Sequence, residues 1–363
     1  MRALGFPGRG WVVMGVVVGL VLCGGLSACV STRLEKKDLP ERPVAFLHWS
    51  DKAGQKRAEI FAKAGEMPRM PPDKVDPERL EELQIRAHLR GDESLGLRTQ
   101  LSKYPGRLTL VWPRTGELEL IEAAPLDAMP LAWSPDGKRL LMVSAHRGDK
   151  EQLYEYHLGR RDLSPVTAGP FEHSRGDYDA KGRVFVQQIS RRRRFGASEN
   201  SVHQVTSGSR VGRALATQVP PGTLRVMPEG DRIVYEQIRP RPRRNGATVF
   251  ESVIAIRSLA LGGKERELAK GREPTLTPDG QWIVFASQST AGYRLRRMRP
   301  DGTVRVPIGP GGTEERMPTV SPDGEYIAFV QTSNGRRRLV VRRYDGKDER
   351  VLVSSGWCEF PVW

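Results

Sequence analysis

The chain has 363 residues, of which 38% are hydrophobic and 28% charged, with 38 glycines and 27 prolines. This is the composition of a globular protein rich in turns, and it excludes a low-complexity chain. The net charge of +15 allows an anionic partner but does not select among nucleic acid, a membrane surface and an acidic protein.

The first 29 residues have the pattern of an exported protein. Arg2 and Arg9 precede the uncharged apolar run 11–22, which is short for a membrane span. Residues 26–29, Leu-Ser-Ala-Cys, resemble the bacterial lipobox, which implies that residues 1–28 are a signal peptide and that Cys29 carries the lipid. The alternative is an uncleaved anchor with an incidental cysteine. Both place the rest of the chain outside the cytoplasm and tie it to a membrane.

Val30, rather than an aspartate, follows the cysteine, which favours the outer over the inner membrane. Residues 29–42 are polar and lack periodicity, so we expect a tether. Cys23 leaves with the signal peptide and Cys29 is acylated, so Cys358 is the one remaining thiol and no intrachain disulfide is expected. We interpret Cys358 as a small buried apolar residue rather than a nucleophile.

Residues 43–49 predict a strand, and residues 51–105 then interrupt the β pattern. Residues 51–64 are amphipathic, and the sequence Asp-Pro-Glu at 76–78 is typical of a helix start. We therefore expect a small helical insertion at 51–105. Its simplest role is a packing cap, and the alternative is a lid that binds a partner.

A repeated turn organises the rest of the chain. Residues 133–137, Trp-Ser-Pro-Asp-Gly, predict a tight turn between two strands. Close copies occupy 277–280 and 321–324, and worn copies occupy 179–182 and 228–230. The turn glycines are 44 to 50 residues apart, the spacing of four-stranded propeller blades.

A second hairpin follows in each repeat, and six such hairpins accompany only five inner turns. Residues 359–363 resemble the strand before each turn, for example residues 317–320. The simplest account is that the C-terminal strand completes a blade begun by residues 43–121, because closing the ring leaves no free edges. The expected fold is an all-β, six-bladed propeller of four-stranded antiparallel blades that spans residues 43–363.

These repeats resemble the WD40-like PD40 repeats of TolB-type β-propellers, from about residue 106 to the end and at 43–49. The resemblance implies the architecture and a periplasmic setting, but propellers host both enzymes and binding platforms. The sequence departs from TolB itself because it carries a lipobox and lacks a separate α/β domain. Prolyl oligopeptidases also carry such propellers, but their Gly-x-Ser-x-Gly motif and hydrolase domain are absent.

No catalytic residue, metal site or cofactor is expected. The six histidines are not at metal-ligand spacings. The turn aspartates Asp136, Asp279 and Asp323 have a sufficient role in turn geometry.

Three basic runs are candidates for anion binding, with solvated loop arginines as the alternative. The candidates are Arg191, Arg192, Arg193, Arg194, Arg239, Arg241, Arg243, Arg244, Arg336, Arg337, Arg338, Arg342 and Arg343. If the runs share one propeller face, lipid headgroups or an acidic protein would fit them. Nucleic acid is not expected, because aromatic residues do not interleave with the arginines.

The sequence as a whole favours a non-enzymatic, monomeric lipoprotein of the cell envelope that binds a protein partner through its propeller. The alternative is a propeller lyase or glycan hydrolase with a site in the central funnel.

Overall fold

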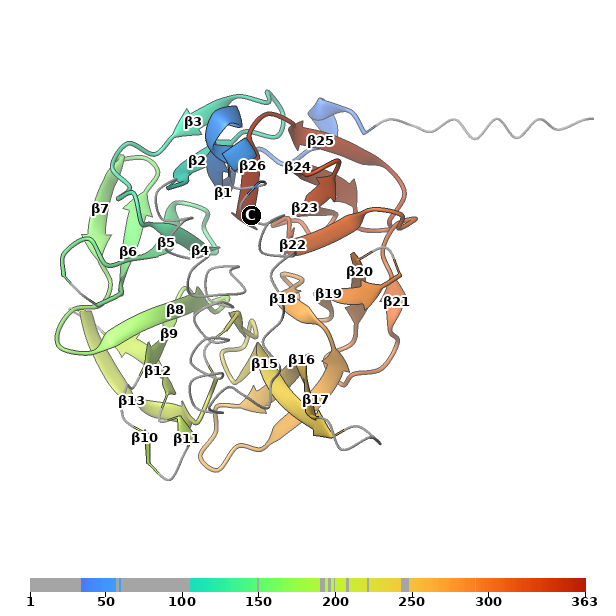
Figure 1. The fold of residues 1–363 in the computed structure, drawn as a ribbon. Coiled ribbons are helices and arrows are strands. Elements are labelled where there is room, and N and C mark those ends of the chain that lie inside the picture. Colours follow the sequence, from blue (N-terminus) through green and yellow to red (C-terminus); the bar gives the residue numbers. More distant parts are fainter. Residues whose placement is uncertain are drawn as a thin grey trace, which may run out of the picture. The chain divides into compact units, whose positions relative to one another are not determined.

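A computed structural model describes residues 34–363, apart from residues 57–58, 60–104, 149, 190–192, 195–196, 199, 207–208, 221, 243–247 and 291. The described residues form six four-stranded antiparallel sheets, the blades of a propeller, arranged around a common axis (Figure 1). The predicted fold class is therefore confirmed.

The strands of each blade are given from the axis outward. Blade 1 contains β26 (Trp357–Val362), β1 (Val44–Trp49), β2 (Arg107–Val111) and β3 (Leu118–Leu120). Blade 2 contains β4 (Met129–Trp133), β5 (Arg139–Ser144), β6 (Gln152–His157) and β7 (Asp162–Pro165). Blade 3 contains β8 (Glu172–Tyr178), β9 (Val184–Ile189), β12 (Ser201–Thr206) and β13 (Arg210–Thr217).

The other three blades follow the chain without interruption. Blade 4 contains β14 (Leu224–Val226), β15 (Arg232–Pro242), β16 (Thr248–Ser258) and β17 (Glu265–Lys270). Blade 5 contains β18 (Arg272–Leu276), β19 (Ile283–Ser289), β20 (Gly292–Met298) and β21 (Val306–Pro307). Blade 6 contains β22 (Glu314–Val320), β23 (Tyr326–Ser333), β24 (Arg336–Arg343) and β25 (Glu349–Val353).

Few elements lie outside the blades. The short strands β10 (Arg193–Arg194) and β11 (Ala197–Ser198) pair within the connection of blade 3, and η1 (Lys36–Asp38) is a single 3-10 turn. Residues 51–56 are helical, at the start of the predicted insertion, and most of that insertion lies outside the described residues. Among the described helices, none combines the length and the apolar character needed to cross a membrane.

The two ends of the propeller meet in blade 1, as the sequence predicted. Strand β1 pairs with β2 on one side and with the C-terminal β26 on the other, so that Ala45 lies opposite Val362 and Trp49 opposite Trp357. The ring is thus closed by strands more than 300 residues apart in the chain. Closure leaves no blade with an unpartnered face.

The repeated turns form for the reason that their sequence indicates. In the first, Asp136 accepts hydrogen bonds from the Ser134 hydroxyl at 2.5 Å and from the Lys138 N–H at 3.1 Å. These donors lower the pKa of Asp136. Gly137 takes a φ of 69°, a region that glycine enters without strain. Asp279 and Asp323 repeat the two contacts, so the structural interpretation of the turn aspartates is confirmed.

Six hydrophobic clusters of described residues fill the spaces between neighbouring blades. Between blades 6 and 1, Phe46 packs in one cluster with Leu339 and Cys358, all with no exposed surface. Between blades 4 and 5, Ile254 shares a cluster with Phe285. Each blade therefore buries both faces against its neighbours, and burial of apolar area is the main stabilising term of the ring.

The predicted tether needs a correction at its C-terminal part, residues 34–42, which we call the strap. Leu34 and Leu39 are 3% and 0% exposed and pack between blades 6 and 1. The strap backbone also accepts hydrogen bonds from Tyr326 of blade 6 and Trp363 of blade 1. Two isolated apolar side chains that fill a gap between blades leave no periodic pattern in the sequence.

The propeller has two distinct faces. On one, which we call the turn face, lie the Pro-Asp-Gly turns, the strap and the C-terminal Trp363. On the other, the hairpin face, each blade joins its second strand to its third. Because the predicted insertion joins β1 to β2, it connects to the propeller on the hairpin face.

Candidate functional site

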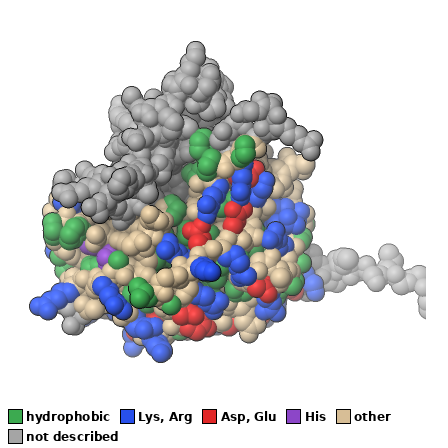
Figure 2. Space-filling model, turned by 90° about the horizontal axis from the view of Figure 1, so that it is seen from below, with side chains coloured by type: hydrophobic (Ala, Val, Ile, Leu, Met, Phe, Trp, Pro, Cys, Tyr) green, Lys and Arg blue, Asp and Glu red, His purple; other side chains and the backbone are tan. Residues whose placement is uncertain are grey.

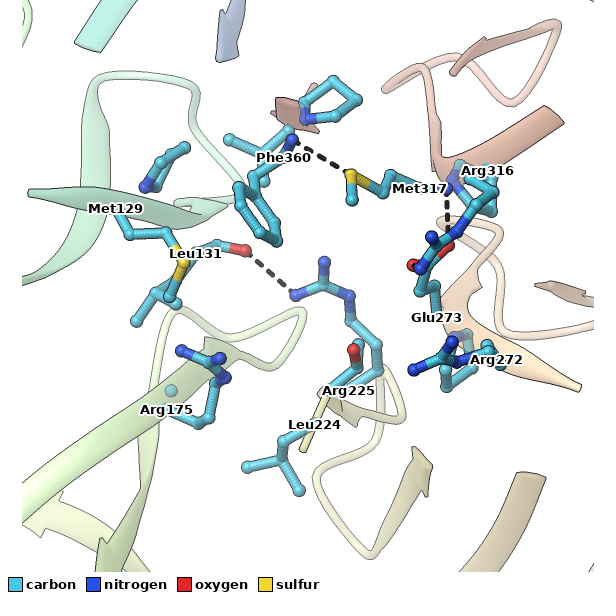
Figure 3. Close-up of a pocket in the computed structure, with 17 residues that line it drawn as sticks. Met129, Leu131, Arg175, Leu224, Arg225, Arg272, Glu273, Arg316, Met317 and Phe360 are labelled. Carbon is cyan, nitrogen blue, oxygen red and sulfur yellow. Dashed lines mark hydrogen bonds and ion pairs between the residues drawn. The ribbon is translucent and has the colours of Figure 1, made fainter. Parts of the chain in front are cut away.

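The innermost strands carry a repeated irregularity that shapes the axis. In five of the six blades the pairing of the first two strands contains a register shift, typical of a β-bulge. Glu273, Met317 and Phe360 occupy such bulges with φ of 55°, 52° and 52°. A proline follows each of them, and proline fits here because it has no N–H to offer an interrupted ladder. The bulges turn these three side chains toward the axis (Figure 3).

A cavity of about 90 Å³ lies at the axis toward the hairpin face. We call it the axial pocket, and strands of all six blades contribute to it. Its apolar wall includes Met129, Leu131, Leu224, Met317 and Phe360. Its charged side chains are Arg175, Arg225, Arg272, Arg316 and Glu273 (Figure 3).

Two carboxylates link successive blades beside the pocket. Glu273 of blade 5 accepts hydrogen bonds from Arg316 Nη2 at 2.5 Å and from the N–H of Met317 at 2.7 Å. Glu236 of blade 4 accepts from Arg272 Nε at 3.1 Å and from the N–H of Glu273 at 2.9 Å. Each carboxylate thus binds both a guanidinium and the bulge N–H of the next blade, which fixes the arginines in position.

The electrostatics of the pair keep Glu273 ionised. Burial raises the pKa of Glu273, but Arg316 and Arg272 outweigh it and the net shift is downward. For Arg316, burial lowers the pKa, but the nearby Glu273 carboxylate raises it by more, so the net shift is upward. A carboxylate held in this state is poorly suited to exchange protons near neutral pH.

Arg225 lies at the centre of the pocket and crosses the axis (Figure 3). Its Nη1 donates to the carbonyl oxygen of Leu131 at 2.9 Å, from blade 4 to blade 2. This is the only hydrogen bond of its side chain to the described residues. Asp177 lies close by, where burial raises its pKa and Arg225 acts in the opposite direction.

Arg225 also separates the axial pocket from a second cavity. That cavity has a volume of about 260 Å³, opens toward the turn face and is lined in part by Asp177, Trp363 and the strap residue Arg42. Arg225, Leu131 and Val362 line both cavities. The hydrogen bond between Arg225 and Leu131 therefore crosses the channel where the two cavities meet.

The arginine runs singled out in the sequence lie elsewhere. Among the described members, Arg193 and Arg194 lie in the β9–β12 connection, Arg239 and Arg241 lie next to the β15–β16 connection, and residues 336–338 lie next to the β23–β24 connection, hence toward the hairpin face. Arg342 and Arg343 lie at the other end of β24, toward the turn face, where Arg343 is opposite Tyr326. Arg191, Arg192, Arg243 and Arg244 lie outside the described residues, and Arg193 and Arg194 are described only as the backbone of β10.

The described arginines of the second run are neutralised. Arg241 pairs with Glu267 and Glu251, and Arg239 pairs with Glu265. Acidic and basic side chains alternate on the side of the molecule that is lowest in Figure 1 (Figure 2).

Blade 6 gives the same result for the third run. Arg337 pairs with the buried Glu359, and Arg342 is itself buried against Glu315. Arg336 is exposed, Arg338 half-buried, and Arg343 lies over the ring of Tyr326. The described arginines of these runs therefore do not form a continuous free cationic surface.

Sequence reasoning missed the four arginines of the pocket because they are isolated in the chain. A signal was nevertheless present. Arg272-Glu273-Pro274 and Arg316-Met317-Pro318 repeat the order arginine, bulge residue, proline at equivalent places in two blades. Arg175 and Arg225 lack this context, and only the ring geometry brings them to the same cavity.

The remaining predicted sites have simple outcomes. Cys29 lies outside the described residues. Cys358 is fully buried, and burial raises the pKa of its thiol to about 12, as expected for an inert packed residue. Within the part of the chain that the structure describes, no three His, Cys, Asp or Glu residues are grouped so as to hold a metal ion.

No protein-family model matches the sequence, and no curated protein is similar to it. Among solved structures, the chain is similar to TolB from Acinetobacter baumannii, with 15% identity, a TM-score of 0.57 and coverage of 89% of this chain and 67% of that one. It is also similar to a putative TolB from Agrobacterium tumefaciens, with 23% identity, a TM-score of 0.52 and coverage of 68% and 87%.

A weaker similarity is to an oligogalacturonate lyase from Vibrio parahaemolyticus, with 13% identity and a TM-score of 0.44 over 68% of each chain. The two stronger matches establish that this chain shares the six-bladed fold of TolB-like propellers. At these identities they establish the fold and leave the function to be argued from the site.

Proposed function

We propose that this protein is a non-enzymatic, monomeric lipoprotein of the cell envelope that binds a protein partner at the hairpin-face end of its axis. The axial pocket is the observation that carries this proposal. It combines an apolar wall with arginines held in place by neighbouring carboxylates, a combination typical of recognition sites.

The chemistry of the pocket favours binding over catalysis. Glycan hydrolysis requires two carboxyl groups, one of them protonated. Among the described lining residues the pocket offers one acid, Glu273, whose pKa is lowered by Arg316 and Arg272. We therefore rank a glycan hydrolase below a binding protein.

The position of the strap supports an orientation on the membrane. The described chain begins with Leu34 on the turn face, where Arg350 donates to the Leu34 carbonyl. Five extended residues reach roughly 17 Å. Acylation at Cys29 would thus keep the turn face near the membrane, with the axial pocket toward the opposite face. As expected from Val30, we propose the outer membrane and the periplasmic side.

The test is photo-crosslinking in cells. A photoreactive phenylalanine analogue replaces Thr223, a half-exposed residue of the pocket, or Arg213, an exposed control on the outer strand β13. We expect a defined crosslinked protein from position 223 and not from position 213. Identical products at both positions, or none at 223, would contradict the proposed site. Loss of radiolabelled palmitate in Cys29→Ala checks the anchor separately.

A further inference from the structure

The axial pocket has a chemical bias that goes beyond protein binding in general. We propose that it binds a carboxylate carried on an apolar group, supplied either by the C-terminus of a protein or by an acidic side chain. This inference rests on the proposed binding role and specifies the chemistry of the ligand.

The charges of the pocket favour an anion. Four guanidinium groups line it, against the single carboxylate of Glu273. Glu236 and Asp177 lie behind the lining and offset part of the excess without removing it. A planar guanidinium can bind both oxygens of a carboxylate through parallel hydrogen bonds.

One of these guanidinium groups has donors available. Arg225 uses only Nη1 among the described residues, for the carbonyl of Leu131, although it is at the centre of the pocket (Figure 3). Arg316 binds Glu273 through Nη2 and its Nε is buried, so Arg316 contributes positive charge to the pocket rather than a free donor. A ligand oxygen that reached the remaining N–H groups of Arg225 would form charge-assisted hydrogen bonds.

The size and lining of the pocket restrict what carries the anion. A volume of about 90 Å³ can hold a small group such as a carboxylate with a few attached carbons. The apolar side chains of Met129, Met317 and Phe360 would pack on those carbons, whereas a free, fully hydrated phosphate would leave them without a contact.

The path through the ring also restricts the ligand. The hydrogen bond from Arg225 to Leu131 crosses the axis where the pocket meets the second cavity. A continuous chain could not pass through without breaking this bond. A chain end or one side chain could enter from the hairpin face and stop at Arg225.

The experiment compares four probes on the full mature chain in detergent by saturation-transfer NMR titration. The probes are N-acetyl-leucyl-phenylalanine, its C-terminal amide, an uncharged peptide amide into which a single glutamate has been placed, and inorganic phosphate. We expect the free acid to bind at least about tenfold more tightly than the amide. The glutamate peptide reports whether a side-chain carboxylate is accepted as well as a terminal one.

The matched variants are Arg225→Gln in the pocket and Arg213→Gln on the exposed surface of β13. Arg225→Gln should abolish the preference for the acid, and Arg213→Gln should keep it. Arg225→Lys retains the positive charge but lacks the planar guanidinium that binds both carboxylate oxygens. It controls for a folding defect, because it should unfold like the wild type and bind the acid with intermediate affinity. Equal binding of acid and amide, tighter binding of phosphate, or the same loss in Arg213→Gln would overturn the proposal.

The outcome can be separated from that of the proposed function. A partner crosslinked at position 223 without any preference for acid probes would retain the binding role and reject the carboxylate. An acid preference that depends on Arg225, without a crosslinked partner, would retain the ligand chemistry and reject the protein partner.

Discussion

The buried ion pair between Arg342 and Glu315 gives the sharpest test of how the blades are held together. Both side chains are 1% exposed, and Arg342 Nη2 donates to Glu315 Oε1 at 2.6 Å. Glu315 also accepts the N–H of Leu295, which belongs to blade 5. Arg342→Met would leave a buried carboxylate without its cation, a change that costs about 3–5 kcal/mol.

This cost can be converted to a melting temperature. The propeller unit runs from Arg33 to Trp363. At about 2.1 cal/mol/K per residue, its roughly 330 residues give an unfolding entropy of about 0.7 kcal/mol/K. A loss of 3–5 kcal/mol then lowers the melting temperature by about 4–7 °C. Differential scanning calorimetry measures this shift, with Arg336→Met, an exposed position on the same strand, as the control.

A second substitution tests the reason. In Arg342→Met with Glu315→Gln, no charge is buried and the glutamine oxygen still accepts the N–H of Leu295. Because apolar or neutral replacements of buried ion pairs are often tolerated, the double variant should recover at least half of the lost stability. The reasoning is refuted if the double variant is as unstable as Arg342→Met, or if Arg342→Met has the same melting temperature as Arg336→Met.

Three further predictions concern single sites. Gly137→Ala should destabilise the protein by about 1–2 kcal/mol, because φ is 69° and a Cβ would lie 2.5 Å from Arg42 Nε. Gly159→Ala is the control, because a Cβ there meets open space and should cost no stability. The midpoints of denaturant unfolding measure both effects. Burial lowers the pKa of His173 to about 4, below its unfolded value near 6.5. Neutral His173 therefore adds up to about 3 kcal/mol to the free energy of unfolding above pH 6.5, and this stability is lost as the pH falls toward 4. Unfolding between pH 4 and 7 should therefore depend less on pH in His173→Asn, and unchanged slopes would count against this assignment. Cys358, whose buried thiol has a pKa of about 12, should react with a maleimide at pH 8 only after denaturation, and labelling of the native protein would disprove its burial.

Local patterns were sufficient where each blade repeats the same short-range solution. The Ser-Pro-Asp-Gly turn fixes its own hydrogen bonds, as Asp136 and Gly137 do, so the turn is readable in one copy and the blade spacing in several. The similarity of residues 359–363 to the other innermost strands was likewise enough to predict closure with β1. The strap was misread because Leu34 and Leu39 are buried by contacts with distant blades, not by a periodic element of their own.

The charged residues divide in the same way. A run such as 336–338 is conspicuous in the chain, yet whether Arg337 is free depends on Glu359 of the next blade, which no local pattern reveals. Arg175, Arg225, Arg272 and Arg316 are dispersed over some 140 residues and share a cavity only because the ring brings every innermost strand to one axis. The sequence by itself thus determined the repeat and the number of blades, which depend on short-range turn chemistry, and the closure of the ring, which follows from the similarity of residues 359–363 to the other innermost strands. The tertiary structure alone decided which charges meet and which remain available, because those contacts join residues from different blades.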